Sequence, residues 1–279
     1  MKRNPLLKAL LSASIFCSLV ATATLANAQV AEPETKEVKA EIHHDAEAIK
    51  IIEASIKASG GKELLESVVS GHTTGTMSIP MAGLSGTMDV YAAQGGNLYM
   101  KIVIPGFGEQ LSGLHDGVGW SIDPMNGPTL TAEDMLTDLI DQSDPQVALN
   151  YETRYTTIKY AGETEFNGTP VHQIDYISAA NGNESTEYYS IETGLLAGSE
   201  ATTNSEMGPI NAISTIGEYG VFGGLTLATK ITQKVGPMNI IIAIDTYKIN
   251  GVDMSIFDHP PVIKSLIEAS KEDTMDDDG

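Results

Sequence analysis

Residues 87–104 read TMDVYAAQGGNLYMKIVI, and the alternation within them is the strongest indication of the fold. Apolar side chains fall on every second position before and after the glycine pair Gly95-Gly96. They are Met88, Val90 and Ala92 on the first side and Leu98, Met100, Ile102 and Ile104 on the second. A period of two with a glycine break predicts two antiparallel strands that bury one face and are joined by a tight turn.

The same alternation continues in both directions from this hairpin. The further strands that we expect are 72–79, 110–114, 117–122, 153–160, 170–178, 187–192 and a glycine-punctuated run over 210–250. Tight turns are predicted at Asp116-Gly117, Asn167-Gly168, Asn181-Gly182 and Asn250-Gly251, since these residue types accept a positive φ.

Three segments have helical spacing instead. Asp45 can cap a helix that carries Ile49, Ile52 and Ile56 on one face and ends at Gly60-Gly61. A second short helix is expected over 62–68 and a third over 131–142. We find no internal repeat and no linker within 45–270. These residues are therefore predicted to form a single domain, mainly β with a few helices (α+β), built on a large curved antiparallel sheet.

The N-terminus has the pattern of a signal peptide over residues 1–28. Basic residues at Lys2, Arg3 and Lys8 precede an uncharged apolar run, and Ala26-Asn27-Ala28 provides a cleavage site. The run is too short for a typical membrane span, and no transmembrane segment is expected in the mature chain. Residues 29–44 are predicted to be a flexible lead-in and residues 271–279 an acidic disordered tail. The chain is expected to be exported, to the periplasm of a Gram-negative bacterium or beyond.

The charge of the chain and its cysteine content exclude several functions. The net charge is −21, which repels nucleic acid, so no nucleic-acid partner is expected. Cys17, the only cysteine, lies within the predicted signal peptide, so thiol catalysis and disulfides are not expected in the mature chain.

No catalytic residue, metal ligand or cofactor site is predicted. The one histidine cluster, His43-His44-Asp45, lacks the spacing of a metal site, and neither a nucleophile elbow nor a phosphate-binding loop is present. Trp120, the only tryptophan, is expected to pack in the core.

Several methionines and isoleucines are expected to share the inner face of the sheet. Met suits a surface that accepts varied apolar shapes, although an ordinary core uses the same residues. The candidate ligand-binding residues are Met77, Met88, Met100, Ile102, Met238, Ile240 and Ile242.

The order of several short motifs resembles that of a known superfamily over about residues 48–265. The motifs include Ala58-Ser59-Gly60-Gly61-Lys62-Glu63, Gly75-Thr76-Met77, Pro105-Gly106-Phe107-Gly108, Asp116-Gly117-Val118-Gly119-Trp120, Gly162-Glu163, Asn167-Gly168-Thr169-Pro170-Val171, Thr193-Gly194-Leu195-Leu196 and Ile249-Asn250-Gly251-Val252. In this order they resemble the LolA/LolB-type, outer-membrane lipoprotein-sorting-like proteins, and more narrowly a branch found alone or appended to exported zinc peptidases. The resemblance implies an open half-barrel sheet wrapped over helices, with an apolar hollow that holds acyl chains in the lipoprotein carriers.

Three functions follow as hypotheses. The first is a non-enzymatic exported protein that binds a lipid, an acyl chain or another apolar ligand in the hollow. The second is an accessory protein for another exported protein, such as a peptidase. The third is a hydrolase whose site has no recognisable motif.

Overall fold

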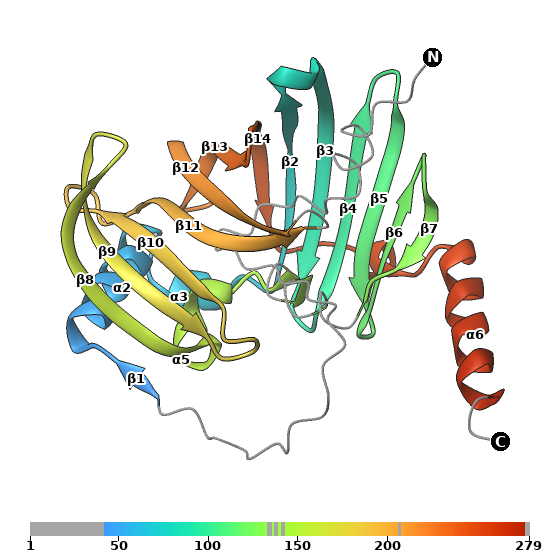
Figure 1. Cartoon of the computed structure of the whole chain (residues 1–279), viewed down its shortest axis with the longest axis horizontal. Helices are drawn as coiled ribbons and strands as arrows, with labels where there is room; N and C mark the ends of the chain where they lie inside the picture. The colour runs from blue at the N-terminus through green and yellow to red at the C-terminus, as the bar shows by residue number, and fades with distance from the viewer. Residues whose placement is uncertain (1–41, 133–135, 137–138, 141–142, 206–207, 277–279) are drawn as a thin grey trace.

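The computed structural model describes residues 42–132, 136, 139–140, 143–205 and 208–276, and these residues contain a single sheet of 14 strands (Figure 1). The strands are β1 (His43–His44), β2 (Ser70–Ile79), β3 (Leu84–Ala93), β4 (Asn97–Ile104), β5 (Gly108–His115), β6 (Val118–Asp123), β7 (Gly127–Leu130), β8 (Tyr155–Phe166), β9 (Thr169–Ser178), β10 (Glu184–Ser190), β11 (Leu196–Ser205), β12 (Gly208–Phe222), β13 (Leu225–Val235) and β14 (Met238–Ile249). Their order in the sheet is β1-β8-β9-β10-β11-β12-β13-β14-β2-β3-β4-β5-β6-β7. All neighbours are antiparallel except β1 and β8, which are parallel.

The sheet is built from two meanders that join at the β14–β2 pair. One meander runs from β2 to the free edge at β7, and the other runs from β8 back to β14. Asn250, just after β14, fastens this junction: its Oδ1 accepts the backbone N–H groups of Val69 and Ser70 at 2.8 and 3.1 Å, and its Nδ2 donates to Ser67 O at 2.9 Å. The ends of the sheet order are β1 and β7, so the curved sheet stays open as a half-barrel.

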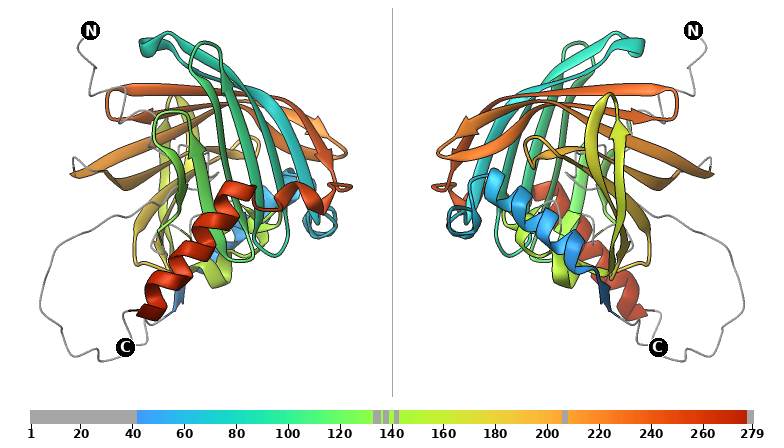
Figure 2. Two further views of the ribbon diagram at one scale, coloured as in Figure 1. Left: turned by 90° about the vertical axis from the view of Figure 1, so that its right-hand side faces the viewer. Right: turned by 90° about the vertical axis from the view of Figure 1, so that its left-hand side faces the viewer.

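The described helices are short and lie at the sheet's inner side and edge. They are α2 (Ala46–Ala58), α3 (Lys62–Glu66), α5 (Tyr151–Arg154) and α6 (Pro261–Asp276), with the 3-10 helices η1 (Pro80–Ala82), η2 (Val147–Leu149) and η3 (Met254–Phe257). Figure 2 shows α2 under the arch of the sheet, where Ile51 and Ile52 pack against Ile158 of β8 and Ile174 of β9. Helix α6 stands beside edge strand β7 (Figure 1). Within the described residues, none of the helices is both long enough and apolar enough to span a membrane.

The predicted fold class is confirmed: the protein is mainly β with a few helices, and the sheet is curved and open. The signal peptide over 1–28 and most of the lead-in over 29–44 lie outside the described residues. His43 and His44, at the end of that lead-in, form β1 and pair with Thr157 and Ile158. Helix α6 extends to Asp276, so part of the stretch 271–279 is helical where the acidic composition predicted a disordered tail.

Two glycines near the junction allow neighbouring strands to approach closely. A Cβ atom on Gly75 of β2 would lie 2.2 Å from Ala243 O, and one on Gly86 of β3 would lie 2.4 Å from Val103 O. The register of β14 against β2 shifts between Ile244 and Thr246, opposite Gly75. Glycine in a strand interior with a neighbouring bulge is typical of a tight bend at a barrel corner.

We therefore expect Gly75→Ala to destabilise the fold, because the added methyl group would collide with the β14 backbone. The free energy of unfolding should fall by about 2 kcal/mol, as for other overpacked sites. Urea denaturation followed by circular dichroism would measure this change.

The matched control is Gly217→Ala in β12. A Cβ atom there would meet nothing closer than the Lys230 side chain at 3.6 Å. Its effect should stay within about 0.5 kcal/mol. Equal effects of the two substitutions would contradict a special role of Gly75 in bending the sheet.

Candidate apolar ligand site on the concave face

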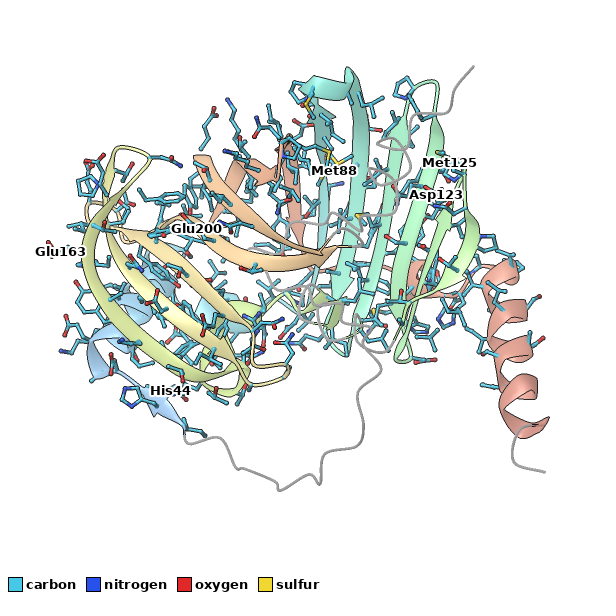
Figure 3. The ribbon with its side chains drawn as sticks, in the orientation of Figure 1. His44, Met88, Asp123, Met125, Glu163 and Glu200 are labelled. Carbon is cyan, nitrogen blue, oxygen red and sulfur yellow. The ribbon has the colours of Figure 1, made fainter. Side chains whose placement is uncertain are left out.

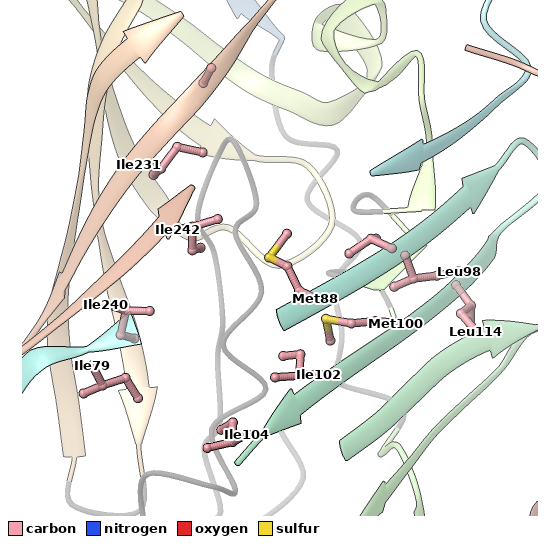
Figure 4. Close-up of a cluster of buried hydrophobic side chains, with 12 residues drawn as sticks. Ile79, Met88, Leu98, Met100, Ile102, Ile104, Leu114, Ile231, Ile240 and Ile242 are labelled. Atoms are coloured by element: carbon pink, nitrogen blue, oxygen red, sulfur yellow. The ribbon is translucent and has the colours of Figure 1, made fainter. Parts of the chain in front are cut away.

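Six of the seven predicted ligand-binding residues come together in one cluster on the concave face. Ile242 of β14 is the register partner of Met77 on β2, and Met88 of β3 is the partner of Ile102 on β4. Figure 4 shows Ile231, Ile240 and Ile242 facing Met88, Met100 and Ile102 across the hollow. The cluster comprises the buried residues Ile79, Met88, Val90, Leu98, Met100, Ile102, Ile104, Leu114, Ala228, Ile231, Ile240 and Ile242, with Met77 packed against it.

The seventh candidate, Met238, lies apart from this cluster. It has the same strand parity as Ile240 and Ile242, but it is the first residue of β14 and is only partly buried. It was predicted to lie on the inner face only because it is two residues before Ile240 in the same strand. Its position along the strand, which the alternation does not reveal, puts it at the end of the sheet.

Two leucines from the stretch between β7 and α5 contact this cluster. Leu136 and Leu139 pack against it. The stretch begins where Thr131 N donates to Gly119 O at 2.8 Å, and near its end Gln146 Nε2 donates to Val68 O at 3.2 Å. The helix expected over 131–142 is confirmed at positions 136, 139 and 140, whereas 133–135, 137–138 and 141–142 lie outside the described residues.

One polar atom on the concave face lacks a partner. Ser112 of β5 is the register partner of Met100 and therefore points to the same side of the sheet. Its Oγ is buried and makes no hydrogen bond. A buried hydroxyl without a partner is costly, so this atom could receive a hydrogen bond from, or donate one to, a polar group of a bound molecule.

A small cleft opens at the end of the apolar face. It is lined by Ile102, Ile104, Phe107, Gly108, Gln110, Pro124 and Met125, and its cavity volume is about 10 Å³. Sites for small ligands usually measure about 300–1,000 Å³. The cleft is therefore far smaller than a ligand site, and an apolar ligand would have to displace the side chains that fill it.

A buried carboxylate that was not predicted from the sequence lies on the inner side of the other meander. Glu187 of β10 is 4% exposed, and the Tyr189 hydroxyl donates to its Oε2. The Tyr176 and Tyr189 hydroxyl oxygens are 3.0 Å apart. Burial raises the pKa of Glu187, although the two tyrosine hydroxyls and the charge of Arg154 oppose this shift.

Two further polar pairs lie on the sheet. His72 Nε2 lies 3.1 Å from Asp89 Oδ1, and Tyr160 Oη lies 3.1 Å from His172 Nδ1. No group of three His, Cys, Asp or Glu side chains in the described residues is placed to bind a metal ion. Trp120 is 1% exposed, which confirms that it packs in the core.

The fold is similar to that of several solved structures. A DUF1329 family protein from Desulfovibrio piger is similar, with a TM-score of 0.54, 11% identity, and coverage of 76% of this chain and 97% of that one. A LolA superfamily protein from Nitrosomonas europaea is similar, with a TM-score of 0.53, 11% identity and the same coverage. A putative outer membrane lipoprotein-sorting protein domain from Vibrio parahaemolyticus is similar too, with a TM-score of 0.51, 12% identity and the same coverage. No family model and no curated protein matches the sequence. The resemblance predicted from the sequence is confirmed at the level of the fold.

Glu187 should make stability depend on pH. Because its pKa is raised on folding, the folded state retains a proton that the unfolded state releases, and stability falls as pH rises above the ordinary value of 4.5. Glu187→Gln keeps an oxygen that can accept from Tyr189 and removes this titration. The variant should gain stability relative to the parent as pH rises above 4.5, measured by urea denaturation at each pH.

Glu163→Gln is the matched control, because Glu163 is an exposed carboxylate on β8. A stability difference for Glu187→Gln that stays constant with pH, or that follows the control, would contradict this account.

Proposed function

We propose that the chain is an exported, non-enzymatic binding protein that holds an acyl chain or a similar apolar ligand against the concave face. The observation that carries the proposal is the continuous apolar cluster from β13 through β14 and β2 to β5, covered by Leu136 and Leu139. The signal-peptide pattern over 1–28 supports export to the periplasm, and the half-barrel fold is one shared with lipoprotein-sorting-like proteins.

The composition of the face favours a flexible ligand of variable shape. Met77, Met88 and Met100 lie between branched isoleucines, and the unbranched Met side chain adapts to different apolar partners. Contacts of this kind are not directional, so they select apolar length rather than a particular headgroup. Ser112 Oγ is a buried, unpartnered polar atom on this face, and it offers a place for an ester or amide group.

The cover explains how such a face can be stable without ligand. Exposed apolar surface costs roughly 25 cal/mol per Å², so a bare concave face would invite aggregation. In the structure, Leu136 and Leu139 supply apolar contacts that an acyl chain would replace. Binding is then an exchange of one set of apolar contacts for another, which keeps the affinity moderate and the ligand releasable.

We expect Met100→Gln to weaken binding of a fluorescent hexadecanoic acid analogue. The two side chains have similar length, but the amide would be buried beside apolar neighbours without a partner. An unpaired buried amide costs about 1–3 kcal/mol, so the Kd should rise about tenfold or more in a fluorescence titration.

Met254→Gln is the control, because Met254 in η3 is 49% exposed and lies outside the cluster. Should Met100→Gln unfold the protein, photo-crosslinking of a diazirine-bearing fatty acid to the parent protein gives an independent readout. Crosslinks mapped by mass spectrometry to β3 and β4 support the site. Unaltered affinity in a folded Met100→Gln variant, or crosslinks only elsewhere, would refute it.

The accessory-protein hypothesis makes a different prediction for the same experiments. A protein that only binds another exported protein needs no acyl ligand, so the parent would neither take up the probe nor carry lipid when isolated from the envelope. Native mass spectrometry of envelope-purified protein distinguishes the two functions.

A further inference from the structure

Four turns of the half-barrel share an unusual composition. Each contains a proline together with a methionine or phenylalanine. They are Pro80-Met81-Ala82 between β2 and β3, Pro105-Gly106-Phe107 between β4 and β5, Pro124-Met125-Asn126 between β6 and β7, and Gly236-Pro237-Met238 between β13 and β14. We call this set of turns the apolar rim.

The apolar rim occupies one end of the sheet. Because β13, β14 and β2 to β7 are successive antiparallel neighbours, these four turns fall at the same end, and Figure 1 shows the turns after β2, β4 and β6 together at the top of the molecule. The start of β14 contacts η1. Three of the four large apolar side chains are exposed, with Met81 at 62%, Phe107 at 38% and Met125 at 46%.

The apolar rim carries no exposed charge. The stretches 79–88, 102–108, 124–132 and 235–244 contain no Asp, Glu, Lys or Arg, in a chain with 53 such residues, 37 of them acidic. Asp123, next to Met125 in Figure 3, is 5% exposed and its Oδ1 accepts the N–H groups of Met125 and Asn126 at 2.8 and 2.9 Å. Its carboxylate therefore shapes the turn and does not face solvent.

The turns at the opposite end of the same strands differ. They are the polar or glycine-rich sequences Gln94-Gly95-Gly96, Asp116-Gly117 and Gly223-Gly224, and the exposed apolar side chains at that end, Val69 and Val221, are valines rather than Met or Phe. Tight turns therefore do not require Pro and Met in this sheet, because glycine and asparagine or aspartate close the other turns at a positive φ. The apolar residues of the rim need another explanation.

From this distribution we infer that the apolar rim docks end-on against a lipid bilayer. Separate hairpin tips with single Met or Phe side chains can each enter the headgroup region, as apolar faces of interfacial proteins do. A net charge of −21 repels an anionic membrane from most orientations, so the uncharged end is the part that can approach closely. A protein partner would instead favour one contiguous apolar patch.

Docking in this orientation would place the ligand site at the membrane. Phe107 and Met125 of the rim line the same cleft as Ile102 and Ile104 of the concave cluster. An acyl chain leaving the bilayer could thus pass between the rim turns and reach the apolar face without crossing water. This second step rests on the proposed function, whereas the docking itself does not.

Vesicle flotation tests the docking with protein purified from the cell envelope in its processed form. The vesicles contain phosphatidylethanolamine with a minority of phosphatidylglycerol. The parent protein should float with them, and the triple variant Met81→Ser, Phe107→Ser, Met125→Ser should lose about tenfold or more of its partition coefficient. The control is Val221→Ser, Met254→Ser, Val262→Ser, which removes three exposed apolar side chains elsewhere and should float like the parent.

The outcomes separate the two proposals. Met81→Ser, the rim substitution that lies outside the cleft, should weaken flotation and still bind the soluble fatty acid probe like the parent, and Met100→Gln should still float. A parent protein that does not float, or flotation that the rim variant retains, overturns the docking. Flotation that disappears in high salt also overturns it, because contact through uncharged side chains is not screened. Loss of probe binding in Met100→Gln concerns only the ligand site.

Discussion

The pairing of β14 with β2 is the constraint on which the rest of the structure depends. It joins strands far apart in the sequence, from Ile241 opposite Ser78 to Ile249 opposite Gly71. Without it the two meanders would be separate sheets, each with an exposed edge and half of the apolar cluster open to water. Closing so long a loop costs entropy, which local contacts cannot repay. The hydrogen bonds of Asn250 and the close approach at Gly75 concentrate contacts at this junction.

The β14–β2 junction also creates the concave face. Because β13 and β14 lie on one side of it and β3 and β4 on the other, bending at Gly75 turns their apolar side chains toward each other (Figure 4). A flat sheet with the same alternation would present these residues to a second layer, as a sandwich does. In the described part of this protein, Leu136 and Leu139 pack against these residues.

Local patterns in the sequence predicted the strands that have a clear apolar alternation and the turns whose residues favour a positive φ. The turns at Asp116-Gly117, Asn167-Gly168 and Asn250-Gly251 adopt the positive φ values that their residues favour. Strand β11, with its small and polar residues, and the short β7, which contains Pro128, have no apolar alternation and were not predicted. Neither pairing partner nor position along a strand is encoded locally. For this reason parity grouped Met238 with Ile240 and Ile242, and nothing marked Glu187 as buried.

The concave face and the apolar rim of this sheet depend on two different features of the sequence, the alternation along the strands and the composition of the turns. Along each strand, alternation keeps apolar side chains on the inner face, while charges such as Lys101 and Glu109 pair on the outer one. At the strand ends alternation no longer applies, and the composition of the turns alone decides what the molecule presents. Polar or glycine-rich turns at one end and Met- and Phe-bearing turns at the other would therefore orient the half-barrel at an interface between water and an apolar phase, without a charged anchor.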